Sequence, residues 1–131
     1  MRHVASNRLR KDEEGRVLGV LPQAFRIRGD SEDHLSAAWV EHANCATMAE
    51  NADATILAFK AKRVVRNSHR FAVGNIGRIK EACLNFGQRV RVSHEPVPGF
   101  WAHASVRQFN SESDELLDLL AQDAWAELFS P

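Results

Sequence analysis

Residues 70–109 read RFAVGNIGRIKEACLNFGQRVRVSHEPVPGFWAHASVRQF, and this stretch decides the fold class. It predicts a strand at 70–73, a helix at 78–86, a strand at 89–94, a loop, and a strand at 102–109. The apolar residues of the helix recur at spacings of three and four, which makes one apolar stripe: Ile76, Ile79, Cys83 and Phe86. Gly87 follows where a left-handed C-cap is expected.

The strand predicted at 89–94 alternates arginine and serine with valine and histidine, as in a sheet with one buried face. Outside this stretch we expect strands at 16–21, a turn at 29–33, a helix at 46–65, and a long C-terminal helix capped by Ser111 and running to Phe129. Residues 1–10 are expected to be loosely ordered. Together these elements predict a single α+β domain, residues 1–131, with two or three helices packed on a small mixed sheet of four or five strands.

The composition is ordinary for a globular chain, with 44% hydrophobic and 26% charged residues. No apolar run approaches the roughly 20 residues of a membrane span, and the polar N-terminus has no signal-like segment. Cys45 and Cys83 are expected to be free thiols. We therefore expect a cytoplasmic protein with no membrane contact. No recognisable metal spacing or cofactor motif is present, so no metal or cofactor is expected.

The charges are segregated along the chain, although the formal net charge is zero. Between Lys60 and Val92 there are nine Lys and Arg residues and one acid, and residues 111–131 hold six acids and no base. One interpretation is a basic surface patch for phosphate or nucleic acid. The alternative is internal pairing of an acidic helix with a basic sheet edge.

The segment Gly74-Asn75-Ile76-Gly77 lies at the predicted junction between strand and helix. Exposed N–H groups at a helix start attract anions, and glycine lets a ligand approach the backbone closely. The segment resembles the GxxG loop of KH domains, which implies contact with a nucleic-acid backbone. Together with the basic residues that follow, it gives a candidate phosphate site of Gly74, Asn75, Gly77, Arg78 and Lys80. The alternative is that the glycines serve turn geometry alone.

Two histidines bracket the loop at 95–102 and are the candidate acid–base residues. Strand parity places His94 on the inner face and His103 on the outer face with Arg91, Ser93, Ser105 and Arg107. We take His103 as the first catalytic candidate and His94 as the second, with Arg91 or Arg107 holding phosphate. The alternative for each histidine is an ordinary hydrogen-bonding role in the core or at the surface.

The loop itself carries an aromatic pair, Phe100-Trp101. This pair either covers the core or offers an exposed contact, in which case Trp101 is a binding residue.

Three short fragments, Ala24-Phe25, Leu35-Ser36 and His103-Ala104, resemble a scattered group of small uncharacterised bacterial proteins over residues 16–107. The resemblance implies no established activity. It does imply that Phe25, Ser36 and His103 converge in the fold.

The sequence favours a binding module for a protein or a phosphate-rich partner, with nucleic acid open as that partner. The alternative is a small enzyme acting on a nucleotide or nucleic acid through a histidine general acid/base. A third interpretation is a structural or oligomeric role, with Trp125 and Phe129 at an interface.

Overall fold

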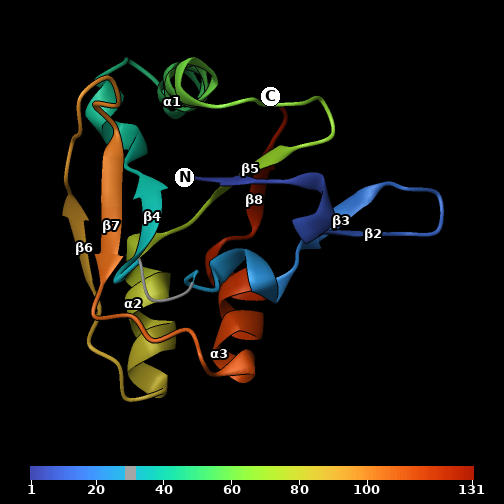
Figure 1. Ribbon diagram of the computed structural model, residues 1–131, viewed down its shortest axis with the longest axis vertical. Helices are drawn as coiled ribbons and strands as arrows, with labels where there is room; N and C mark the ends of the chain where they lie inside the picture. The colour runs from blue at the N-terminus through green and yellow to red at the C-terminus, as the bar shows by residue number, and fades with distance from the viewer. Residues whose placement is uncertain (29–31) are drawn as a thin grey trace.

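The computed structural model describes residues 1–28 and 32–131, and these form an α+β fold (Figure 1). The helices are α1 (Met48–Lys62), α2 (Ile76–Asn85) and α3 (Asp114–Leu119), and α3 continues as the π-helical turn η5 (Leu120–Ala124). Short 3-10 turns are η1 (Ser6–Arg8), η2 (Pro22–Phe25) and η4 (Val40–Ala43). The strands are β1 (Arg2–Val4), β2 (Leu9–Lys11), β3 (Val17–Val20), β4 (His34–Ala38), β5 (Arg70–Val73), β6 (Arg91–His94), β7 (His103–Arg107) and β8 (Glu127–Phe129).

These strands form three small antiparallel sheets, with the orders β1-β5-β8, β2-β3 and β4-β7-β6. In the last of these, Ser36 pairs with Ser105 and Ser105 with Ser93, so one sheet face carries a row of three serines. The predicted single mixed sheet of four or five strands is therefore wrong, although the α+β class is confirmed. The strands at Arg70 and Arg91 do not pair with each other, because each is the neighbour of an antiparallel partner in a different sheet.

The two predicted internal helices are confirmed. Thr47 caps α1 through a capping box with Glu50, and Asn75 caps α2, where the Arg78 N–H donates to Asn75 Oδ1 at 3.1 Å. Gly87 follows α2 with φ of 73°, as expected of a residue that ends a helix in the left-handed region.

Both ends of the chain differ from the prediction, and for the same reason: each adds a strand to an edge of β5. The N-terminus is not loose, since His3 pairs with Phe71. The C-terminal helix stops at η5, and Leu128 pairs with Ala72 in β8. Its N-cap is Ser113, which accepts a hydrogen bond from the Leu116 N–H, and not Ser111. Both terminal strands form because the two edges of β5 carry backbone N–H and C=O groups that need hydrogen-bond partners.

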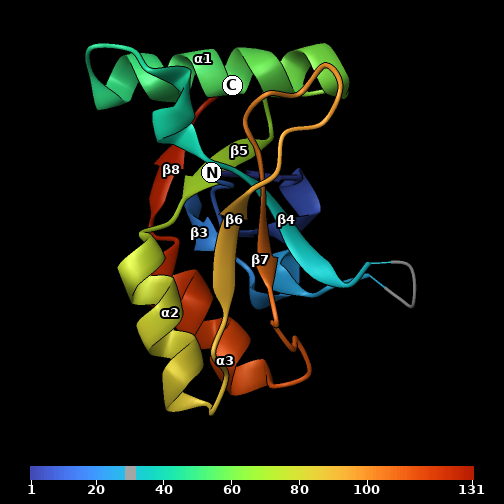
Figure 2. The same ribbon diagram turned by 90° about the vertical axis from the view of Figure 1, so that its left-hand side faces the viewer.

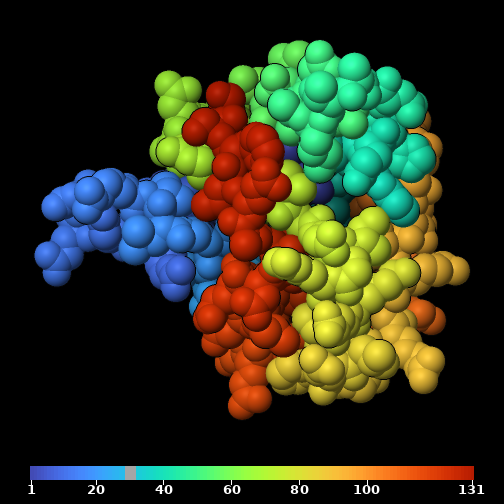
Figure 3. All heavy atoms as spheres, turned by 180° about the vertical axis from the view of Figure 1, so that it is seen from behind, coloured from blue at the N-terminus to red at the C-terminus, as the bar shows by residue number. Residues whose placement is uncertain are grey.

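The elements surround two buried clusters. One lies between the β4-β7-β6 sheet, α2 and α3 and includes Phe25 and Trp125, and the other lies under α1 and includes Phe59, Phe71 and Phe100. Figure 2 shows α1 lying across one end of the molecule, with α2 and α3 at the other end. The β2-β3 hairpin projects from the body (Figure 3).

No helix in residues 1–28 and 32–131 combines the length and the apolarity that a membrane crossing requires. The turn predicted at 29–33 lies partly outside the described residues, which omit 29–31.

Candidate functional site

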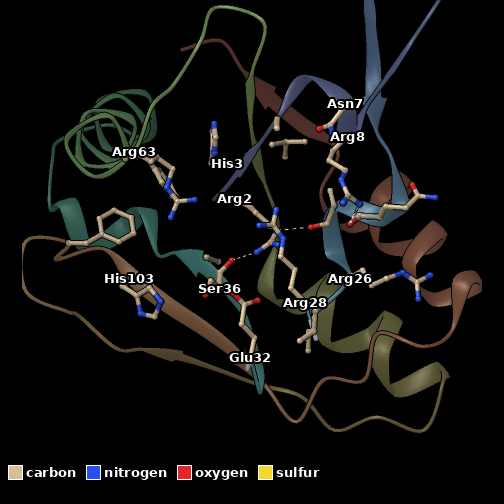
Figure 4. Close-up of a pocket in the computed structure, with 18 residues that line it drawn as sticks. Arg2, His3, Asn7, Arg8, Arg26, Arg28, Glu32, Ser36, Arg63 and His103 are labelled. Carbon is tan, nitrogen blue, oxygen red and sulfur yellow. Dashed lines mark hydrogen bonds between the residues drawn. The ribbon is translucent and has the colours of Figure 1, made fainter. Parts of the chain in front are cut away.

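A cavity of about 630 Å³ opens between the N-terminal segment, η2, β4, β7 and α1. We call it the basic cavity, because the described residues that line it include five arginines, two histidines and one acid: Arg2, Arg8, Arg26, Arg28, Arg63, His3, His103 and Glu32. Figure 4 shows the guanidinium groups of Arg2, Arg28 and Arg63 directed toward the middle of this space. Phe59 and Phe100 add apolar walls.

Arg2 lies at the centre of the basic cavity and is fixed by the backbone (Figure 4). Its Nε donates to the Ala24 carbonyl at 2.8 Å, and one terminal nitrogen donates to the Ser36 carbonyl. Burial lowers the pKa of Arg2 to about 10; Glu32 opposes this shift, and Arg28, Arg63 and Arg8 add to it. Arg2 therefore stays charged at neutral pH, at an electrostatic cost that a bound anion would offset.

His3 and Arg63 form a second group on the α1 side of the cavity. His3 Nε2 and His69 Nδ1 are 2.8 Å apart and share one hydrogen bond, while the Arg63 guanidinium lies over the Phe59 ring at 5.3 Å. Burial lowers the pKa of His3 to about 4, with further contributions from Arg63, His69 and Arg2. Burial and Arg28 also lower the pKa of Arg63. His3 is thus neutral near pH 7 and serves as a hydrogen-bonding group.

The remaining arginines differ in their partners. Arg26 forms an ion pair with Asp114, and Arg8 donates to the Gln23 carbonyl at 2.9 Å. Within the described part of the chain, Arg28 and Arg63 form no salt bridge. The described lining of the cavity therefore carries more positive than negative charge.

The sheet face next to this cavity carries a chain of hydrogen bonds. Glu95 binds Arg107 at 2.8 Å, and Arg107 reaches Asp33 at 3.4 Å. Asp33 Oδ1 binds His34 Nδ1 at 2.7 Å, and His34 Nε2 lies 3.3 Å from Ser36 Oγ. The Arg107 guanidinium is thus occupied by two carboxylates, which leaves it poorly suited to hold phosphate.

His103 and His94 lie on opposite faces of the sheet, as strand parity predicts. His103 lines the basic cavity, and its Nδ1 lies 2.7 Å from the Glu95 carbonyl. His94 is stacked on His42 with 3.5 Å between ring centroids and contacts the Trp101 carbonyl through Nε2 at 2.7 Å. Of the two catalytic candidates, only His103 lies at the basic cavity.

A second cavity of about 410 Å³ lies at the start of α2 and contains most of the predicted phosphate segment. Gly74, Asn75, Gly77 and Arg78 line it, whereas Lys80 does not. Its other charged lining residues are acids: Glu41, Asp123 and Glu127. The hollow is visible in Figure 3 between η4, the start of α2 and the C-terminal segment.

Gly74 has a steric reason to be glycine, because a Cβ there would lie 2.6 Å from Trp125 Cδ2. The Trp125 indole is 3% exposed and closes one wall of the second cavity. This contact supports turn and packing geometry as the explanation of the glycine.

The other predicted binding residues lie apart from both cavities. Arg91 is exposed on β6, which is an edge strand. Trp101 is 39% exposed on the loop between β6 and β7, while its neighbour Phe100 is buried. The sequence therefore grouped residues that the fold separates into several places.

The resemblance implied that Phe25, Ser36 and His103 come together in the fold, and two of these three residues line the same cavity. Ser36 and His103 both line the basic cavity, and Figure 4 shows them on adjacent strands. Phe25 is fully buried and packs against Trp125 with ring centroids 5.5 Å apart. Its neighbour Ala24 lines the cavity instead.

The predicted basic patch of residues 60–92 does not form the basic cavity. Of its nine Lys and Arg residues only Arg63 lines that cavity, while Lys62 binds the Pro98 carbonyl and Arg70 binds the Asn67 carbonyl. The cavity's other arginines, at positions 2, 8, 26 and 28, were missed. Their only sequence signal is the excess of arginine in residues 1–28, and this does not indicate that the segments meet.

Among the described residues, no three His, Cys, Asp or Glu side chains gather closely enough to hold a metal ion. Comparison with protein-family models, with curated proteins and with solved structures gives no match to this chain.

Proposed function

We propose that this protein is a binding module for a phosphate-bearing small molecule, which occupies the basic cavity. The observation that carries the proposal is the crowding of five arginines around one space, with Glu32 as the only acid among the described residues that line it. Arginine is suited to this role because its planar fork of N–H donors matches the oxygens of a phosphate group.

The size and the walls of the cavity support a ligand of nucleotide dimensions. A volume of about 630 Å³ lies within the range of small-molecule sites, roughly 300–1,000 Å³. Phe59, Phe100 and His103 offer ring surfaces beside the arginines, so an aromatic or sugar moiety has apolar contacts while its phosphates meet the guanidinium groups.

Calorimetric titration with inorganic pyrophosphate and with a nucleoside diphosphate tests this proposal. Arg28→Ala and Arg63→Ala are the informative variants, since both residues are exposed and neither forms a salt bridge within the described part of the chain. Each substitution is expected to weaken binding about tenfold or more, because a hydrogen bond to a charged group contributes about 1.5–3 kcal/mol.

Arg89→Ala and Arg91→Ala are matched controls, because both arginines are exposed and neither lines the cavity. These variants should bind like the wild type. Equal losses in the controls, or no binding by the wild type, would contradict the proposal.

A further inference from the structure

Three polar side chains at the start of β4, those of Asp33, His34 and Ser36, form the arrangement of a nucleophile with its base and orienting group. Asp33 Oδ1 binds His34 Nδ1 at 2.7 Å, and His34 Nε2 lies 3.3 Å from Ser36 Oγ. With the proton on Nδ1 facing the carboxylate, Nε2 is free to accept the serine proton. A serine, a histidine and a carboxylate in this order are recognised by geometry, and the serine contact is often longer before substrate binds.

Strand geometry explains why these residues meet. His34 and Ser36 are two positions apart on β4, so both side chains stand on the same sheet face. Their cross-strand partners on that face are Arg107 and Ser105. Arg107 binds Asp33 Oδ2 from β7 and is held in turn by Glu95, which fixes an otherwise exposed carboxylate. The hydrogen bond to His34 lowers the pKa of Asp33, and Arg107 lowers it further by a smaller amount. The Asp33 carboxyl is therefore ionised.

Ser36 lies at the wall of the basic cavity, while His34 and Asp33 lie behind it and do not line that space. The Arg2 guanidinium contacts the Ser36 carbonyl directly, and Arg28 and Arg63 face the same space (Figure 4). A phosphate held by these arginines therefore shares the cavity with Ser36, the residue of the described lining whose hydroxyl oxygen contacts a histidine nitrogen.

We propose that the protein hydrolyses phosphate monoesters, with Ser36 as the nucleophile and His34 as its base. This inference rests on the proposed phosphate ligand and names the reaction at that site. Ser36 Oγ forms a bond to phosphorus as its proton passes to His34 Nε2, and the bond from phosphorus to the leaving alcohol breaks. The leaving oxygen takes a proton from solvent.

The second step returns the enzyme to its starting state. Water attacks the phosphoserine, releasing one proton to solvent, and the bond between phosphorus and Oγ breaks as His34 returns its proton to Ser36. The products are the alcohol and inorganic phosphate. The arginines stabilise the charge on the phosphoryl oxygens in both steps, which is the main task of a protein in phosphoryl transfer. Asp33 acts as a positioning residue for His34.

Release of alcohol from p-nitrophenyl phosphate and of phosphate from adenosine monophosphate tests the proposal in the full chain. The wild type is expected to turn over at least one of the two. Ser36→Ala and His34→Gln should each lower turnover about 100-fold or more, as expected when a nucleophile or its base is removed. Asp33→Asn should have a smaller effect, because Asp33 is 82% exposed and solvent replaces part of its role. Ser93→Ala, in the same row of serines on β6, is the matched control and should keep full turnover.

Pyrophosphate binding, measured in parallel, separates this inference from the proposed function. Ser36→Ala and His34→Gln should bind pyrophosphate like the wild type, which also shows that they fold. Binding by the wild type without turnover of either ester would overturn the hydrolysis and leave the binding function standing. Full turnover by Ser36→Ala or by His34→Gln would overturn the assigned roles. Absence of pyrophosphate binding would remove the basis of both.

Discussion

The two cavities of this protein are assembled in different ways. The basic cavity takes its arginines from three separate segments, at residues 2–8, 26–28 and 63, whereas the second cavity takes its arginine, Arg78, from the continuous stretch 73–79 and its acids from other segments, at residues 41, 123 and 127. The continuous stretch carries a recognisable glycine pattern, yet three of the four charged side chains around it are acids. The separate segments carry no pattern and together form the more positive site. The positive charge of a cavity in this protein thus depends on which segments the fold brings together.

The largest expected effect concerns the packing of the second cavity. Gly74→Ala should lower the free energy of unfolding by about 1–3 kcal/mol, the usual cost of overpacking, because the new Cβ would overlap the buried Trp125 indole and approach Ile79 Cδ1 at 3.0 Å. Urea denaturation of the variant and the wild type measures this difference in the free energy of unfolding.

Gly77→Ala is the control on the same segment, since its Cβ would meet only Asn75 Oδ1 at 3.2 Å. We expect a change within about 0.5 kcal/mol, as for most surface substitutions. Equal losses at the two positions would contradict a steric role for Gly74. Pyrophosphate binding by folded Gly74→Ala should match the wild type, which keeps the two cavities functionally separate.

An intermediate effect is expected from pH at the basic cavity. The pKa of His3 is about 4 in the folded protein against an ordinary value of 6.5 for histidine, so the unfolded chain binds more protons between these pH values. The contribution of His3 to stability should therefore fall as pH decreases from about 6.5 and level off below about 4. His3→Phe, which keeps a ring beside Phe59 and Phe71, should reduce this slope in urea titrations at several pH values. An unchanged slope would exclude His3 as its source.

The smallest effect is expected at Glu32, the only acid among the described residues that line the basic cavity. Glu32→Gln should strengthen pyrophosphate binding by about 0.2–1 kcal/mol, at most about fivefold, because exposed charge pairs contribute little. Asp118→Asn, an exposed acid away from the cavity, is the control. Weaker binding by Glu32→Gln would mean that this carboxylate contacts the ligand directly.

Helical periodicity predicted α1 and α2 because their buried stripes are local in sequence, and parity predicted the opposite faces of His94 and His103. The C-terminal strand was missed because Leu128 and Phe129 also fit the helical spacing, and pairing with β5 decided the outcome. The N-terminal strand was missed because residues 2–4 carry no strand pattern of their own and form a strand by pairing with β5.

The candidate site was predictable only in part. His103 was predicted as a site residue because it follows the loop at 95–102. Ser36 was named only through the resemblance to small bacterial proteins. The pairing of His34 with Ser36 is the one feature that strand alternation could have indicated, since the two residues are two positions apart on a strand. The arginines could not be assigned to one place, because the contacts that gather them span most of the chain.

The most direct test of the central claim is an NMR titration that follows the arginine side-chain Nε–H signals as pyrophosphate is added. We predict shifts at Arg2, Arg8, Arg28 and Arg63, which surround the basic cavity, and none at Arg78 or Arg91. Shifts confined to Arg78 and the backbone of residues 74–77, or no shifts at any arginine, would contradict the account.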